Sequence, residues 1–169
     1  MPLVPQVTLK ASEKWAVDFV GPINPPGKRT GTRYIITVTE YLTRWAEATA
    51  IKDYTTTKAS KFVFENVVTR FGCPRILMSD QGRHFVNETI ATLTEVFQIH
   101  HSKSTPYHPQ ANGIVEAFNK NMEQALIKVC NVQRDDWDLR VPAVLWAYRT
   151  RCKKLKDHTP FELCMAKKQ

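Results

Sequence analysis

The chain has 169 residues, 43% of them hydrophobic and 24% charged, which excludes a wholly disordered protein and is typical of one globular domain. Lysine and arginine number 24 against 16 acidic residues, a net charge of +8. This surplus indicates a polyanionic partner, nucleic acid first and a membrane surface second, or else a basic surface that meets only solvent. No apolar run approaches the ~18 residues of a membrane span, so no membrane partner is expected.

The first part of the chain is predicted to form three strands. Along 14–20 apolar residues alternate with small or polar ones, the period-2 pattern of a strand, and a Gly-Pro pair ends the segment. Two segments rich in β-branched and aromatic residues follow at 34–41 and 45–51, close enough in the chain to form a hairpin. We therefore expect an antiparallel three-stranded start.

Helices alternate with short strands in the rest of the chain. Apolar spacing and cap residues predict, in order, a helix from Thr55–Thr57 to Phe71, a buried strand over 75–79, a helix from Asn87, a strand over 99–102, and helices over 112–129 and 136–149. The order β-β-β-α-β-α-β-α-α is typical of an α/β fold with a mixed sheet flanked by helices.

Three acidic residues stand at positions that suggest chemistry. Asp18 lies inside the most apolar strand, where a buried carboxylate needs a partner or a cation, unless it points to solvent. Asp80 follows the buried strand, at a sheet end of the kind that binds ligands, although an aspartate there is also ordinary turn chemistry. Glu116 lies off the apolar stripe of its helix, and its alternative role is an ion pair with Lys120.

Together the three carboxylates indicate more than each does alone. Two strand-associated aspartates and a helical glutamate can converge above one sheet edge and hold a divalent metal. Mg²⁺ takes oxygen ligands. Two such ions about 3.5–4 Å apart stabilise the attacking and leaving oxygens of a phosphoryl transfer. In a basic chain, such a site would act on a nucleic acid backbone.

Several ordered segments resemble the catalytic core of retroviral and retrotransposon integrases. They are W-A-V-D-F-V-G-P (15–22), S-D-Q-G-R-H-F-V-N (79–87) and P-Y-H-P-Q-A-N-G-I-V-E-A-F-N-K (106–120). The segments 41–48, 145–150 and 158–163 are most similar to the gypsy-type branch of LTR retrotransposons. The 35 residues between Asp80 and Glu116 match the D,D-35-E signature of the family.

The resemblance implies an RNase H-like fold, with a five-stranded mixed β-sheet flanked by α-helices, and a DDE-type polynucleotidyl transferase. Asp18, Asp80 and Glu116 would be its catalytic residues and the ligands of two Mg²⁺ ions, for which Mn²⁺ can substitute. Such an enzyme processes the 3′ ends of the retroelement DNA and transfers them into target DNA.

The family's active-site loop and helix also have matching positions here, which are expected to contact DNA. They are Tyr107, Gln110, Asn112, Asn119 and Lys120. Lys120, one turn after Glu116, is placed to meet a phosphate beside the metals. The basic run at 149–156 is either a DNA-facing edge or a solvated helix end.

The resemblance also implies a domain arrangement and partners. We expect residues 1–14 to be an N-terminal extension and 15–165 to be the integrase core. The family's zinc-binding N-terminal domain and C-terminal DNA-binding domain have no counterpart in these 169 residues, so no zinc is expected. The implied partners are retroelement DNA ends, target DNA and further copies of the chain, in a homodimer or higher oligomer. The implied location is the nucleus, after cytoplasmic assembly in a retroelement particle.

Two other functions stay open at this point. Glu40 stands where the gypsy-type branch usually has aspartate, and Ile114 where glutamine is common, as in a decaying genomic copy. One alternative is an RNase H-like DNA nuclease that uses only water as its nucleophile. The other is a catalytically dead DNA-binding or assembly module of a decayed retroelement. Metal-dependent DNA joining would identify the transferase, cleavage without joining the nuclease, and absence of divalent-metal binding the dead module.

Overall fold

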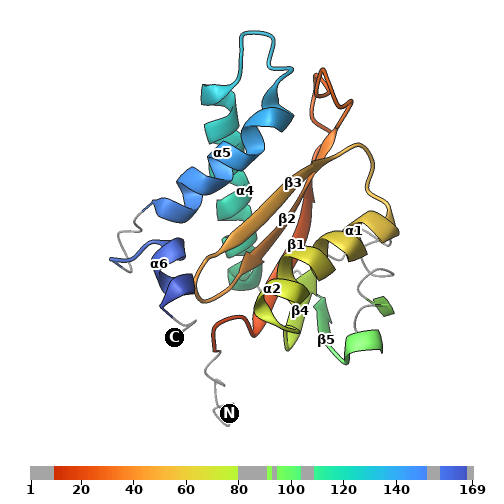
Figure 1. The fold of residues 1–169 in the computed structure, drawn as a ribbon, viewed down its shortest axis with the longest axis vertical. Coiled ribbons are helices and arrows are strands. Elements are labelled where there is room, and N and C mark those ends of the chain that lie inside the picture. The colour runs from red at the N-terminus through yellow and green to blue at the C-terminus, as the bar shows by residue number, and fades with distance from the viewer. Residues whose placement is uncertain (1–9, 80–90, 93–94, 104–108, 152–156, 167–169) are drawn as a thin grey trace.

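A five-stranded mixed sheet forms the centre of the protein. The computed structural model describes residues 10–79, 91–92, 95–103, 109–151 and 157–166. The sheet contains, in spatial order, β3 (Ala46–Ile51), β2 (Tyr34–Glu40), β1 (Lys14–Val20), β4 (Ile76–Ser79) and β5 (His100–Lys103) (Figure 1). The strands β1, β2 and β3 are antiparallel neighbours, whereas β4 runs parallel to β1 and β5. The predicted α/β class and mixed sheet are confirmed.

Helices cover both faces of this sheet. They are α1 (Thr56–Val63), a π-helical turn η1 (Phe64–Val68), α2 (Thr69–Phe71), α4 (Pro109–Val129), α5 (Trp137–Thr150) and α6 (Pro160–Met165). The first three follow one another without a break, where the sequence predicted one helix. None of the helices within the described residues combines the length and apolarity that crossing a membrane requires.

The structure corrects one predicted helix boundary and adds one helix. The helix predicted from residue 112 begins at Pro109, because proline lacks only a backbone N–H that the first turn leaves unbonded anyway. The helix α6 was not predicted, although Thr159 and Glu162 form a capping box around it. The predicted helix start at Asn87 lies outside the described residues, of which 91–92 and 95–97 are helical.

The period-2 alternation of β1 determines which residues face which layer. Trp15, Val17 and Phe19 enter the core under α1 and α2, and Val20 enters the core under α4 and α5 (Figure 1). Asp18 lies on the same side as Val20, because residues two apart on a strand share a face. The alternation that forms the strand therefore turns a carboxylate toward α4.

Tyr148 joins α5 to this second core. Its hydroxyl donates a hydrogen bond to the Arg44 carbonyl oxygen, 3.0 Å away, and its ring meets the Phe118 ring edge-on, with centroids 4.7 Å apart. Burial raises the pKa of Tyr148 to about 12, with the positive charge of Arg44 acting in the opposite direction. Since the unfolded chain ionises this phenol near pH 10, the folded state holds the proton more tightly.

We expect this difference to appear as alkaline destabilisation. The contribution of Tyr148 to the free energy of unfolding is complete below pH 10 and is lost as the pH rises toward 12. Urea unfolding of wild type and Tyr148→Phe at a series of pH values measures it. The stability advantage of the wild type should shrink by roughly 2–3 kcal/mol over this range. A constant difference between the two proteins would contradict this assignment.

Candidate active site

Asp18 is held by a side chain of α4. Its Oδ2 accepts a hydrogen bond of 2.7 Å from Nδ2 of Asn119. Thr37, opposite Asp18 in the β1–β2 register, is buried. Its hydroxyl lies 3.4 Å from both Oδ1 of Asn119 and the Asp18 carbonyl oxygen, either of which can accept its hydrogen. The half-buried carboxylate that the sequence placed in an apolar strand therefore has a polar partner rather than only solvent.

Glu116 and Lys120 lie on α4 on either side of Asn119. Both side chains are exposed. Among the residues that the structure describes, no ion pair links Glu116 to Lys120. The alternative in which Lys120 neutralises Glu116 is thus not what the structure shows. Glu116 lies one turn before Asn119, so the strand and the helix bring two of the three predicted acids to the same region.

Several predicted site residues fall outside what the structure describes. Asp80 and Tyr107 lie outside the described residues, and of Gln110 and Asn112 only the backbone, within α4, is described. The last residue of β4, Ser79, is the register partner of Val17. Within the described part of the chain, no three His, Cys, Asp or Glu side chains gather closely enough to hold a metal. The predicted metal set contains Asp80 and therefore stays a prediction.

Thr37 is the residue of this site that the sequence did not reveal. It faces Asp18 only because of the β1–β2 register, and it reaches Asn119 across 82 positions of sequence. With Oδ1 of Asn119 near the Thr37 hydroxyl, the amide turns its NH₂ group toward Asp18. Thr37 therefore lies within reach of the amide that bonds the Asp18 carboxylate.

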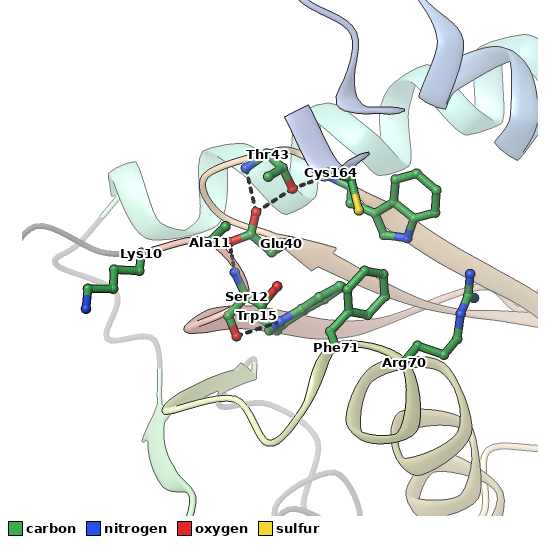
Figure 2. A pocket seen from close by; sticks show the side chains of 10 residues that line it. Lys10, Ala11, Ser12, Trp15, Glu40, Thr43, Arg70, Phe71 and Cys164 are labelled. Atoms are coloured by element: carbon green, nitrogen blue, oxygen red, sulfur yellow. Dashed lines mark hydrogen bonds between the residues drawn. The ribbon is translucent and has the colours of Figure 1, made fainter. Parts of the chain in front are cut away.

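Glu40, an acidic residue outside the predicted catalytic set, has a different role. It lines a cavity of about 540 Å³ on the α1–α2 side of the sheet (Figure 2). Its carboxylate is only 2% exposed and accepts hydrogen bonds from the backbone N–H groups of Ser12, Leu42 and Thr43 and from the Thr43 hydroxyl. Three of these donors bond Oε2 and one bonds Oε1, so both carboxylate oxygens have partners within the protein. Glu40 therefore bonds both the β2–β3 turn and Ser12, a structural task.

The fold and the site together define a class of protein. Residues 9–109 match the family model described as the integrase core domain, and the chain belongs to this family. The structure resembles the catalytic core domain of BIV integrase, with a TM-score of 0.71 and 21% identity over 93% of this chain and 96% of that one. This likeness confirms the predicted RNase H-like fold.

Relatives occur in retroviruses and in a transposon. The chain is 24% identical over 153 residues to the Retrovirus-related Pol polyprotein from transposon 412 of Drosophila melanogaster, covering 90% of the chain and 12% of the polyprotein. It is 31% identical over 150 residues to the Gag-Pol polyprotein of woolly monkey sarcoma virus, covering 88% and 9%. The chain thus spans about a tenth of the length of these relatives. The resemblance to integrases is confirmed, and the gypsy-type assignment stays a prediction.

Proposed function

We propose that this chain is the catalytic core of a retroelement integrase, a polynucleotidyl transferase. It would process the 3′ ends of the element's DNA and transfer them into target DNA. The hydrogen bond of 2.7 Å between Asn119 and Asp18 carries this proposal, because it ties a strand carboxylate to the helix that bears Glu116. The β1–β4 register adds support, since Val17 and Ser79, the residues before Asp18 and Asp80, are partners.

The residue types fit divalent metal ions. Carboxylate oxygens from Asp18, Asp80 and Glu116 are the hard ligands that Mg²⁺ and Mn²⁺ take. Ions bound there would supply charge stabilisation for the attacking and leaving oxygens of an in-line displacement. The protein's own contribution is orientation, because Asn119 donates a hydrogen bond to one oxygen of Asp18.

The remaining contacts in the proposal concern DNA. Lys120 is exposed, one turn after Glu116, and supplies a positive charge for a phosphate near the acids. We assign Tyr107, Gln110 and Asn112 to the same DNA-contacting group by their match to the family's loop and helix. Asn119, predicted for that group, instead bonds Asp18 through its amide. The proposed core spans 15–165, with Lys14, the last residue of the predicted extension 1–14, already in β1. The proposed location is the nucleus, where target DNA lies.

A gel assay on branched DNA tests the function. The wild type and Asp80→Asn are incubated with strand-joining and disintegration substrates in Mg²⁺ or Mn²⁺. Metal-dependent joining that disappears in the variant is the expected result. Cleavage without joining would instead identify a nuclease. If neither reaction occurs, calorimetric titration with Mn²⁺ is the second measurement, and absence of binding would identify a catalytically dead module.

We also propose that the core forms a homodimer through α5. Trp146 is 53% exposed and meets the Phe161 ring of α6 edge-on, with centroids 5.6 Å apart. Leu139, also exposed, lies seven residues earlier on the same helix face. Large apolar side chains that share an exposed face are typical of an interface between subunits.

Sedimentation velocity should detect this interface through the Trp146→Lys variant. A lysine at the centre of an apolar contact would leave a desolvated charge, so the dimer should shift to monomer at micromolar concentration. Val132→Lys is the matched control, because Val132 is 94% exposed in the turn after α4 and lies on another surface. Equal dimerisation of Trp146→Lys and the control would place the interface elsewhere.

A further inference from the structure

A cavity of about 410 Å³ lies next to the candidate active site. It is enclosed by the loop after β1 and by the C-terminal half of α4, which lie at the same end of the molecule (Figure 1). Apolar walls come from Ile23 in the loop, Leu126 and Ile127 on α4, and Trp137 on α5. The volume is within the roughly 300–1,000 Å³ of small-ligand pockets.

Both elements that carry the proposed acids continue into this cavity. Val20 lines it, two residues after Asp18 and on the same side of β1. On α4, Glu123 and Ile127 follow Asn119 at successive intervals of four residues, on one helix face. Four residues advance a helix by about 6 Å, so the cavity begins one turn beyond the Asn119–Asp18 contact.

The exposed residues that line the cavity include one acidic and one basic side chain. Glu123 is exposed there, and a carboxylate repels phosphate but accepts hydrogen bonds from the exocyclic amines of bases. Arg134, also exposed, offers a guanidinium that pairs with phosphate. Burial, followed by the nearby charge of Asp136, raises the pKa of the Cys130 thiol, so that wall stays uncharged at neutral pH.

Hydrogen bonds within the protein hold the loop after β1, which forms one wall of the cavity. Ile23 donates its backbone N–H to the Arg33 carbonyl oxygen at 2.7 Å, and the Trp137 indole donates to the Pro25 carbonyl oxygen at 2.9 Å. Gly21 has a φ of +129°, and a Cβ there would lie 2.7 Å from the Arg33 carbonyl oxygen. A preformed wall reduces the entropy cost of binding.

We propose that this cavity receives an unpaired nucleobase that carries an exocyclic amine, from the DNA strand held at the candidate active site. The base would place its faces against Ile23 and Ile127, its amine at Glu123, and its backbone phosphate toward Arg134. Separating a base from its pairing partner costs least free energy at the end of a duplex, because a terminal base pair stacks on only one other pair. This inference rests on the proposed function and defines the part of the DNA substrate that the site selects.

Fluorescence anisotropy with three labelled DNA probes tests the inference. Each probe is the same duplex with a short single-stranded overhang of cytosines, thymines or abasic nucleotides, on the 3′ or the 5′ strand. Cytosine has an amine where thymine has a carbonyl group. The wild type should bind a cytosine overhang about tenfold more tightly than an abasic one, and about fivefold more tightly than a thymine one.

Variants locate the effect in the cavity. Ile127→Trp fills it from an exposed position and should abolish the difference between cytosine and abasic overhangs. Glu123→Ala should abolish only the difference between cytosine and thymine. Gln124→Trp, at an exposed α4 residue that lines a different groove between α4 and α5, is the matched control and should bind like the wild type.

The outcomes separate this inference from the proposed function. Equal binding of all three overhangs by the wild type, or a full cytosine preference in Ile127→Trp, overturns the nucleobase pocket while metal-dependent joining still stands. The second result would place the recognition of the base outside this cavity. A chain that binds none of the probes and joins no DNA overturns both proposals.

Discussion

The Asp18→Asn variant is expected to lose metal-dependent DNA joining by about a thousandfold or more while keeping its fold. A metal-ligating carboxylate contributes several kcal/mol to the transition state, and each 1.36 kcal/mol is a factor of ten in rate. The fold should persist because the amide oxygen of asparagine can still accept the hydrogen bond from Asn119 that Asp18 accepts at 2.7 Å. Single-turnover joining rates measure the loss.

Thermal unfolding gives an independent measurement on the same variant. Mg²⁺ or Mn²⁺ should raise the melting temperature of the wild type, because an ion that binds only the folded state stabilises it, and should leave Asp18→Asn unchanged. Asp53→Asn makes the same chemical change at an exposed carboxylate that pairs with Lys58 at 2.7 Å, and should retain both activity and the metal response. Unfolding of Asp18→Asn at ordinary temperature would show that Asp18 is a structural residue.

The strands were predictable because each has a local cause. In β1, the alternation of apolar and polar residues predicted a strand over Lys14–Val20, and the structure has the strand with the same bounds. The continuous apolar run before Asp80 predicted a buried strand, and β4 lies between β1 and β5. The helix α6 also had a local signal, since Thr159-Pro160-Phe161-Glu162 contains the capping box, but its six residues are too few to show helical periodicity.

The contacts of the candidate site were not predictable in the same way. Residue type and spacing, with the family resemblance, selected Asp18 and Glu116. The partner of Asp18 is an amide 101 positions away, and nothing in the spacing along the chain indicates that these two side chains meet in the fold. Thr37 needed the strand register as well. Long-range side-chain pairs depend on how layers pack, and that is decided by the whole core.

The basic run at 149–156 shows the same limitation. Its first residue, Arg149, is largely buried and pairs with Glu47 on β3, so it does not form a DNA-facing edge. Its guanidinium also donates to the Ala46 carbonyl oxygen and lies 4.2 Å from the centre of the Trp45 ring. Residues 152–156 lie outside the described residues. Two of the segments with gypsy-type similarity, 41–48 and 145–150, thus meet in one structural cluster.

Glu47→Ala is expected to lower the free energy of unfolding by about 3–5 kcal/mol, the usual cost of leaving a buried ion without its partner. Glu47 accepts hydrogen bonds from the Trp45 indole at 2.9 Å and from Arg70 at 2.6 Å, and its other oxygen pairs with Arg149. Burial lowers the pKa of Arg149, and the charge of Glu47 opposes this shift. For a chain of this length the melting temperature should fall by roughly 10 °C.

Two further variants determine whether burial of the Glu47–Arg149 ion pair causes the loss of stability in Glu47→Ala. Arg70→Ala removes a partner of the same carboxylate whose side chain is 43% exposed, and should cost at most about 1 kcal/mol, because solvent already screens that pair. The double variant Glu47→Leu, Arg149→Met removes both buried charges and should be more stable than Glu47→Ala alone, because no unpaired ion remains. If Glu47→Ala cost no more than Arg70→Ala, the cluster would be a screened surface pair. β3 and α5 would then be held together by their apolar contacts and by the hydrogen bonds from Arg149 to the Ala46 carbonyl oxygen.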